Sequence, residues 1–423
     1  MKYILSLVLS CAAFPMLAES LWPNNGIELS GFGTLGLVST DSEFYGYRRD
    51  ISQTKGAFEH ELDFNSVSVF GLQLDANINN TLDAVYQSVY RDQNDISVDS
   101  ITSMAFLRYS PHVAWSVRLG RTPVDLFLLS EYRDIGFAYT WAQAPSEVYG
   151  MIPYRHLDGL DITYSTQFSD LTLRSKVYTG KSKADISAVD FTEEIKIDNI
   201  YGVSLTLEAM NWAVNVRYTE VKVAQNTSLQ KSLSQGISQI PDAIWPNSAS
   251  FAESISLLNR NIKYASISGR YDFGSWQLLS EFTHTKSESP VIPELLAGYA
   301  SIIKQYKDHA FYLIAAFTDS DNFDISALNV NTQLLSFVPR GLELYHAVNQ
   351  SMNFYASNQQ TLSVGWRWDI KENLALKLQL DHTKVEEEGG TLWLNKNTTA
   401  IPNQLLTPKE TINTLSTNLS FTF

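Results

Sequence analysis

Apolar and polar residues alternate along much of this chain with a period of two. In residues 374–381 the four even positions are all leucine. The odd positions between them include Lys377, Gln379 and Asp381. Because successive side chains of a β-strand point to opposite faces, such a segment predicts a strand with one apolar and one polar face. Residues 160–168 and 212–219 alternate in the same way.

Strand-like segments recur over the whole chain, so we predict a single all-β domain of about sixteen strands. In Phe64–Ile78 the alternation changes phase near Gly71, which indicates a β-bulge. His309–Thr318 is apolar on both faces. The predicted strands are Ile27–Val38, Phe64–Ile78, Leu82–Arg91, Ile101–Ser110, His112–Arg121, Gly159–Phe168, Leu171–Thr179, Ile200–Ala209, Trp212–Lys222, Ile262–Phe273, Trp276–Lys286, His309–Thr318, Asn322–Asn331, Thr361–Ile370, Asn373–Val385 and Thr411–Phe423.

The connections between these segments alternate between short turns and long loops. The short turns contain typical turn residues, such as Ser169-Asp170 and Met210-Asn211. This alternation is typical of transmembrane β-barrels, which have short turns on one side and long loops on the other. The apolar faces would then meet lipid and the polar faces would line the lumen. The long connections are 39–63, 122–157, 181–199, 223–261, 287–308, 332–360 and 386–410.

The beginning of the chain has the pattern of a secretory signal peptide. A basic start at Lys2 is followed by an apolar stretch that ends at Leu17-Ala18. We therefore expect a signal peptide over 1–18 and a barrel domain over 19–423. The single cysteine, Cys11, lies in the signal, and its lipid modification is the less favoured alternative. Beyond residue 18 no apolar run approaches the roughly 20 residues of a transmembrane helix.

Composition and motifs exclude several functions. The formal net charge of −14 argues against nucleic acid, which requires a basic face. The seven histidines form no HExxH motif, and the chain has neither GxSxG nor a phosphate-binding loop. We therefore expect no enzyme activity, no catalytic residues, no cofactor and no metal site.

The architecture resembles the Gram-negative porin superfamily. The resemblance rests on the strand and loop pattern, on the long third connection and on a final apolar-and-polar strand that ends at Phe423. It implies a barrel in the outer membrane, surrounded by lipid and lipopolysaccharide, and a homotrimer that passes small hydrophilic solutes and ions. It also implies that Phe423 is an assembly signal. The doubly apolar segment 309–318 is a candidate for the subunit interface.

The connection 122–157 is the candidate constriction, and it is the third outer loop because the shorter connection 92–100 precedes it. It is too apolar to extend into water, so we expect it to fold into the lumen or against a neighbour. In porins, acidic residues of this loop face a basic wall, and the resulting field orients polar solutes. We expect the same arrangement here, although these charges could also be simple loop-fixing ion pairs. The candidate residues are Asp125, Glu131, Arg133 and Asp134 on the loop, and Arg118, Arg174, Lys176, Arg217, Arg367 and Lys377 on the wall.

Three other functions stay open at this stage. A substrate-specific channel for sugars or other nutrients would use the aromatic residues of the third connection as a stacking track. A barrel enzyme would show catalytic residues, which we do not find, and a structural barrel would have a plugged lumen. Residues 223–260 and 332–357 have helix-like apolar stripes, which predict short helices over the barrel mouth or a ligand-selecting vestibule. The aromatic candidates are Phe127, Tyr132, Phe137, Tyr139 and Trp141.

Overall fold

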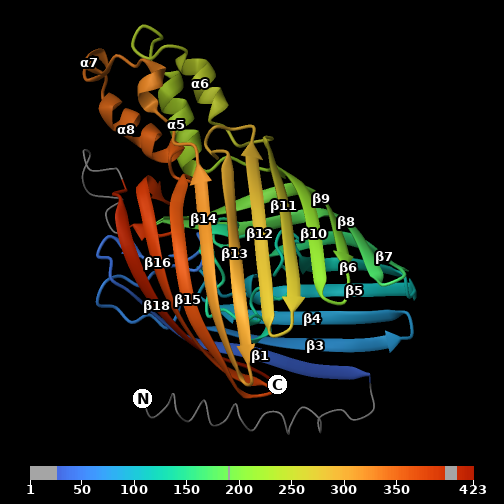
Figure 1. The fold of residues 1–423 in the computed structure, drawn as a ribbon. Coiled ribbons are helices and arrows are strands. Elements are labelled where there is room, and N and C mark those ends of the chain that lie inside the picture. The colour runs from blue at the N-terminus through green and yellow to red at the C-terminus, as the bar shows by residue number, and fades with distance from the viewer. Residues whose placement is uncertain (1–25, 189–190, 396–406) are drawn as a thin grey trace.

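The computed structural model describes residues 26–188, 191–395 and 407–423, so the predicted signal peptide lies outside the described residues. Sixteen strands form one closed antiparallel barrel in which the first strand pairs with the last (Figure 1). The predicted transmembrane β-barrel is therefore confirmed. The barrel strands are β1 (Ile27–Thr40), β3 (Val69–Asn79), β4 (Leu82–Arg91), β5 (Thr102–His112), β6 (Trp115–Pro123), β7 (His156–Phe168), β8 (Leu171–Ala188), β9 (Phe191–Glu208), β10 (Trp212–Val223), β11 (Asn261–Phe273), β12 (Trp276–Ser287), β13 (Leu295–Tyr306), β14 (His309–Ser320), β15 (Ser357–Lys371), β16 (Leu374–Gly390) and β18 (Glu410–Thr422).

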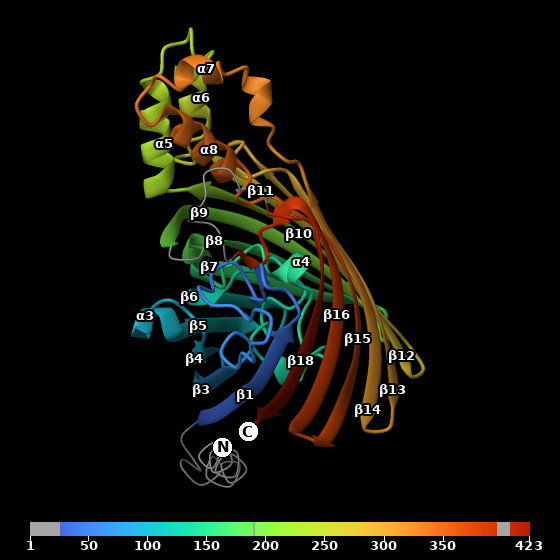
Figure 2. The ribbon, with the colours of Figure 1, turned by 90° about the vertical axis from the view of Figure 1, so that its left-hand side faces the viewer.

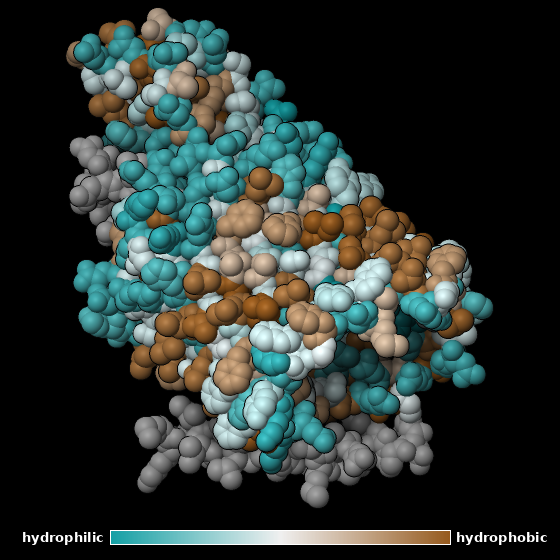
Figure 3. Space-filling model, in the orientation of Figure 1, coloured by the Kyte–Doolittle hydropathy of each residue, from teal (hydrophilic) through white to brown (hydrophobic). Residues whose placement is uncertain are grey.

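The alternation of the sequence separates the two surfaces of the barrel. On β10, Val214 and Val216 are exposed on the outside, whereas Asn215 and Arg217 are buried inside. Figure 3 shows hydrophobic side chains gathered across the barrel wall and hydrophilic ones over the region above it. Because a Lys or Arg on the lipid face costs about 2–4 kcal/mol at the bilayer midplane, the charged positions must point inward.

One predicted strand is wrong and one strand was missed. Asn322–Asn331 is not a strand, because it contains the short helix η2 (Ile325–Leu328) within an outer loop. Strand β13 lacks alternation, so the pattern of the sequence predicts a loop at 287–308 where the structure has this strand. Its inward residues include Ala297, Tyr299 and Ile303, which pack on a loop inside the barrel. The other fifteen predicted segments coincide with strands, so the two errors cancel in the total.

Two local predictions are also wrong. The supposed loop 181–199 consists largely of strand, because β8 and β9 extend beyond the other strands near them. The β-bulge near Gly71 is absent, since β3 pairs without a register shift with β1 from Val69 to Ala76. Residues 64–68 lie before β3 and do not belong to the strand. Including them in the predicted strand made the alternation seem to change phase near Gly71. Gly71 instead leaves room for the ring of Phe32.

The predicted helices form a cluster at the outer end of the barrel (Figures 1 and 2). Its core contains Ile237, Trp245, Leu335 and Val348. None of the helices in the described ranges is long and apolar enough to cross a membrane. The helices of the cluster are α5 (Ser228–Ser238), α6 (Ser248–Ser254), α7 (Thr332–Leu335) and α8 (Gly341–Met352). The remaining short elements are α3 (Val98–Ile101), η1 (Gly136–Ala138), α4 (Ser146–Tyr149) and a two-stranded ribbon of β2 (Tyr45–Gly46) and β17 (Leu394–Asn395).

Candidate functional site

The third connection, residues 124–155 (loop 3), lies inside the ring of strands (Figure 2). It packs on the inner wall of β12–β14, where Trp141 meets Tyr299 edge-on at 5.3 Å between ring centroids. The Trp141 Nε1 group donates a hydrogen bond to Ser301 Oγ at 2.9 Å. The inner residues Tyr312 and Ile314 of β14 belong to the same apolar cluster. Loop 3 thus explains the apolar inner face of the segment 309–318, and the subunit interface predicted for this segment concerns its outer face.

Two buried side chains of the wall anchor loop 3 through hydrogen bonds. Glu281 of β12 accepts from Leu128 N at 2.9 Å and from the Tyr149 hydroxyl at 2.7 Å. Lys377 of β16 donates through Nζ to the carbonyls of Gly136, Tyr139 and Trp141. Both side chains are fully buried. Lys377 was predicted to line the lumen, but loop 3 covers it completely.

A cluster of charges, the loop clamp, joins loop 3 to the first outer loop, residues 41–68 (loop 1). Arg155 donates to Asp50 at 2.5 Å and to Asp134 at 2.7 Å. Arg133 lies 3.7 Å from Asp50. Arg133 and Asp134 were predicted to face the pore, and here they hold two loops together instead. The members of the clamp are Arg49, Asp50, Arg91, Arg133, Asp134 and Arg155.

The clamp carboxylates stay ionised because the arginines outweigh their burial. Burial alone would raise the pKa of Asp50, but Arg155, Arg133 and Arg49 hold it far below its usual range. The pKa of Asp134 is lowered for the same reason, chiefly by Arg155 and Arg91 against the effect of burial. Burial, reinforced by Arg155, lowers the pKa of Arg133 to about 9, so it remains a cation at neutral pH.

Acidic residues of loop 3 meet basic residues of the opposite wall directly. Asp125 lies 2.9 Å from Arg217 and 3.0 Å from Lys176. Glu131 lies 3.2 Å from both Lys176 and Arg118. The structure therefore brings together five of the ten candidate constriction residues as ion pairs.

A large cavity of about 540 Å³ lies beside these pairs, between loop 3 and the inner faces of β5–β12. Arg174 lines this cavity and makes no ion pair with any residue in the described part of the chain. Arg108 and Arg270 also line it, and neither is among the residues predicted above, although each follows the alternation of its strand. The charged lining consists of Arg108, Arg118, Arg174, Lys176, Arg217, Arg270, Asp125, Glu131 and Glu208.

The five aromatic residues of loop 3 do not form one continuous track. Phe127 and Trp141 are almost completely buried against the wall and neighbouring loop residues. The rings of Phe137 and Tyr139 lie beneath the cations of Arg367 and Lys377, at 4.8 and 4.7 Å. Tyr132 and the buried Phe127 reach the large cavity.

We expect Lys176 to set the pH at which the ion selectivity of the barrel interior changes in acid. Burial alone would raise the pKa of Asp125 and of Glu131, but Lys176, with Arg217 and Arg118 respectively, lowers each below its usual value. Both carboxyl groups then stay charged until the pH falls below the usual pKa range of Asp and Glu side chains. Protonating them removes negative charge, so anion preference should rise only in strong acid.

Replacing Lys176 by methionine should move that rise in anion preference upward by about one pH unit or more, since one opposite charge is lost. The measurement is the reversal potential in a salt gradient between pH 7 and pH 3. Lys181→Met, an exposed position of the same strand, is the control and should titrate like wild type. An identical midpoint for Lys176→Met and wild type would contradict this account.

Comparison with known proteins shows a shared fold at low sequence identity. No protein-family model and no curated protein matches this chain. OmpF of Salmonella typhi, solved with daunomycin, has a TM-score of 0.51 at 12% identity, covering 94% of this chain and 98% of that one. OmpT of Vibrio cholerae, expressed in the outer membrane, has a TM-score of 0.50 at 7% identity, covering 95% and 99%.

The chain therefore has the barrel fold of Gram-negative outer-membrane porins, as its sequence pattern predicted. A closed barrel with an apolar outer wall satisfies its backbone hydrogen bonds within lipid. The fold and this wall point to the Gram-negative outer membrane, in agreement with the sequence analysis.

Proposed function

We propose that this protein is an outer-membrane channel through which small hydrophilic solutes and ions diffuse passively. The observation that carries the proposal is the cavity of about 540 Å³ inside the closed barrel. Its wall presents hydroxyl and charged groups from the inward positions of β5–β11, which is the surface that hydrated solutes require. The outer wall would lie in lipid and lipopolysaccharide.

We further propose that the channel prefers anions. Six basic and three acidic side chains line the cavity, so its surface carries an excess of positive charge. The ion pairs of Asp125 and Glu131 neutralise part of this charge. Arg174 is exposed and unpaired within the described ranges, so its field acts on passing solutes undiminished by a partner. We assign the constriction to Asp125 and Glu131 on loop 3 and to the facing residues Arg118, Arg174, Lys176 and Arg217.

Single-channel recording from the purified protein in a planar bilayer tests both proposals. Discrete conductance steps are expected, and the reversal potential in a KCl gradient should have the sign of anion preference. Steps grouped in threes would support a homotrimer. Silence at every voltage would overturn the channel proposal, whereas a cation-selective reversal potential would overturn only the proposed preference.

Reversing the charge of Arg174 should shift the reversal potential toward cations. The variant Arg174→Glu changes two unit charges at an unpaired lumen position, and the expected result is loss or inversion of anion preference. Lys231→Glu makes the same charge change on the exposed surface of α5 and should leave the reversal potential unchanged. Equal reversal potentials for Arg174→Glu and wild type would show that Arg174 does not face the conduction path.

A further inference from the structure

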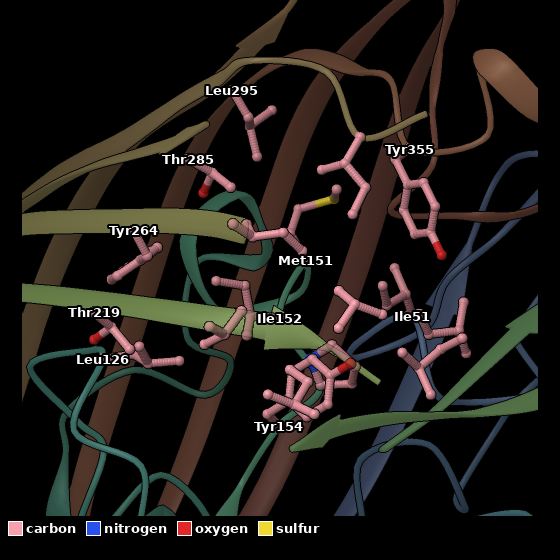
Figure 4. Close-up of a pocket in the computed structure, with 18 of the residues that line it drawn as sticks. Ile51, Leu126, Met151, Ile152, Tyr154, Thr219, Tyr264, Thr285, Leu295 and Tyr355 are labelled. Carbon is pink, nitrogen blue, oxygen red and sulfur yellow. The ribbon is translucent and has the colours of Figure 1, made fainter. Parts of the chain in front are cut away.

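Loop 3 divides the barrel interior into two compartments of opposite character. Toward the outer ends of the strands, a cavity of about 130 Å³ is lined by mostly apolar side chains, among them Ile200 and Val221 (Figure 4). Val124 of loop 3 lines this cavity, whereas the next residue, Asp125, lines the large cavity. The charged side chains gather in the large cavity of about 540 Å³, so we expect a charged solute to be recognised there.

Five of the six basic residues that line the large cavity are already paired with carboxylates of the chain. A carboxylate that lies against a guanidinium or ammonium group occupies its N–H donors and offsets its charge, so these five residues attract a solute less strongly than their number suggests. The pairs are Arg108–Asp83 at 2.9 Å, Arg118–Asp161 at 2.8 Å, Lys176–Asp125 at 3.0 Å, Arg217–Asp125 at 2.9 Å and Arg270–Asp272 at 3.1 Å.

Arg174 is the sixth basic residue, and its guanidinium group is free. The side chain is exposed to the large cavity and forms neither an ion pair nor a hydrogen bond with any residue in the described ranges. The closest acidic position on the neighbouring strand β9 is Glu208, two residues beyond the partner of Arg174 in the sheet. Glu208 lies 3.5 Å from Arg270, so it is engaged on the side away from β8. A free guanidinium group presents parallel N–H groups that match two oxygens of a carboxylate or phosphate.

Three hydroxyl groups lie near Arg174 on the adjacent strands. Ser165 of β7 is its direct partner across the sheet, and Thr163 is the diagonal neighbour on the same inward face, within reach of a long side chain. Ser116 of β6 lies opposite Thr163. All three residues line the large cavity, and their hydroxyl groups have no hydrogen-bond partner in the part of the chain that the structure describes. They are therefore available to donate to oxygens that the guanidinium group does not bind.

This set of donors favours an oxyanion over a halide ion. A carboxylate or phosphate group has two or more oxygens, which can accept separately from the guanidinium group and from a hydroxyl group, whereas chloride offers a single atom. The cavity of about 540 Å³ is much larger than either group, so it leaves room for the carbon skeleton of a small organic anion.

We propose that Arg174, together with Ser116, Thr163 and Ser165, binds the carboxylate or phosphate group of a small organic anion. This inference rests on the proposed anion-preferring channel and names the class of solute that the channel favours. Binding is measured without conduction, so the inference and the proposed function can fail separately.

The direct test is binding of fluoroacetate and of monofluorophosphate to the purified protein in lipid nanodiscs, followed by fluorine NMR at constant ionic strength. Saturable binding of at least one probe is expected for wild type, and the tighter probe identifies carboxylate or phosphate as the preferred group. Chloride should displace the bound probe about fivefold less effectively than acetate or phosphate, since it cannot bridge the donors. No saturable binding of either probe, or equal displacement by chloride, would overturn the inference. A cation-selective reversal potential of wild type in KCl would instead overturn the proposed anion preference.

Two variants test the residues of the site. Arg174→Lys keeps the charge and should weaken binding of the tighter probe about fivefold, because a point charge replaces a pair of parallel donors. Arg340→Lys makes the same change at an exposed position of the helical cluster and should bind like wild type. Equal affinities of Arg174→Lys and wild type would mean that charge alone attracts the anion, which would overturn the site.

Ser165→Ala remains decisive if Arg174→Lys does not fold. It should weaken binding about threefold, since one hydroxyl donor is lost. Ser175→Ala, on the lipid-facing side of β8, is the control and should bind like wild type. Heat-dependent electrophoretic mobility confirms that each variant is folded. Equal affinities of Ser165→Ala and Ser175→Ala would overturn the role of the hydroxyl group.

Discussion

Replacing Asp50 by asparagine should release loop 3 from loop 1 and produce large, noisy conductance. Asp50 is almost fully buried and pairs with Arg155 and Arg133. Once Asp50 has lost its charge, Asp134 is the only acid left among the clamp members. The four arginines of the loop clamp then repel one another. Breaking a buried ion pair on one side costs about 3–5 kcal/mol, because the remaining charges are uncompensated.

Single-channel current noise and cleavage of loop 3 by added protease measure this release. We expect open-channel fluctuations and faster cleavage within residues 124–155, while the barrel itself remains resistant to unfolding in detergent. Asp321→Asn makes the same change at an exposed position of an outer loop and should behave like wild type. Quiet current and unchanged cleavage in Asp50→Asn would mean that the apolar cluster alone holds loop 3 in place.

Replacing Lys377 by methionine should detach the centre of loop 3 from strand β16 and enlarge the channel. The Lys377 ammonium group binds three carbonyls of residues 136–141, and no water reaches it. Methionine fills a similar volume but donates nothing, and each buried carbonyl left unpaired costs about 1–3 kcal/mol. The segment should therefore move toward water in the lumen, which frees space at the wall.

Conductance and passage of uncharged polymers of graded size measure the enlargement. A larger polymer cut-off is expected for Lys377→Met than for wild type. Lys384→Met is the matched control, because Lys384 lies on the outward face of the same strand and is exposed. If Lys377→Met keeps the cut-off of wild type while folding normally, the neighbouring Arg367, which donates to the carbonyls of Phe137 and Tyr139, is sufficient to hold the segment.

Charged residues were easier to identify in the sequence than their partners were. Asp125 and Glu131 face the basic wall as expected, whereas Arg133 and Asp134, close by in the same loop, turn toward loop 1. A loop has no fixed period, so sequence spacing does not state which way a side chain points. The pairing of Asp134 with Arg155 and Arg49 depends on contacts between segments distant in the sequence.

The sequence by itself determined the barrel, because lipid outside and water inside impose a period of two on each strand. That rule fails where the lumen holds protein in place of water. Strands β13 and β14 are apolar on both faces because loop 3 packs on their inner side. The same applies to Val221 and Ile200, which line a cavity that exists only once loop 3 divides the lumen. Only the tertiary structure decided these features, since the environment of an inward residue is created by a loop folded from elsewhere in the chain.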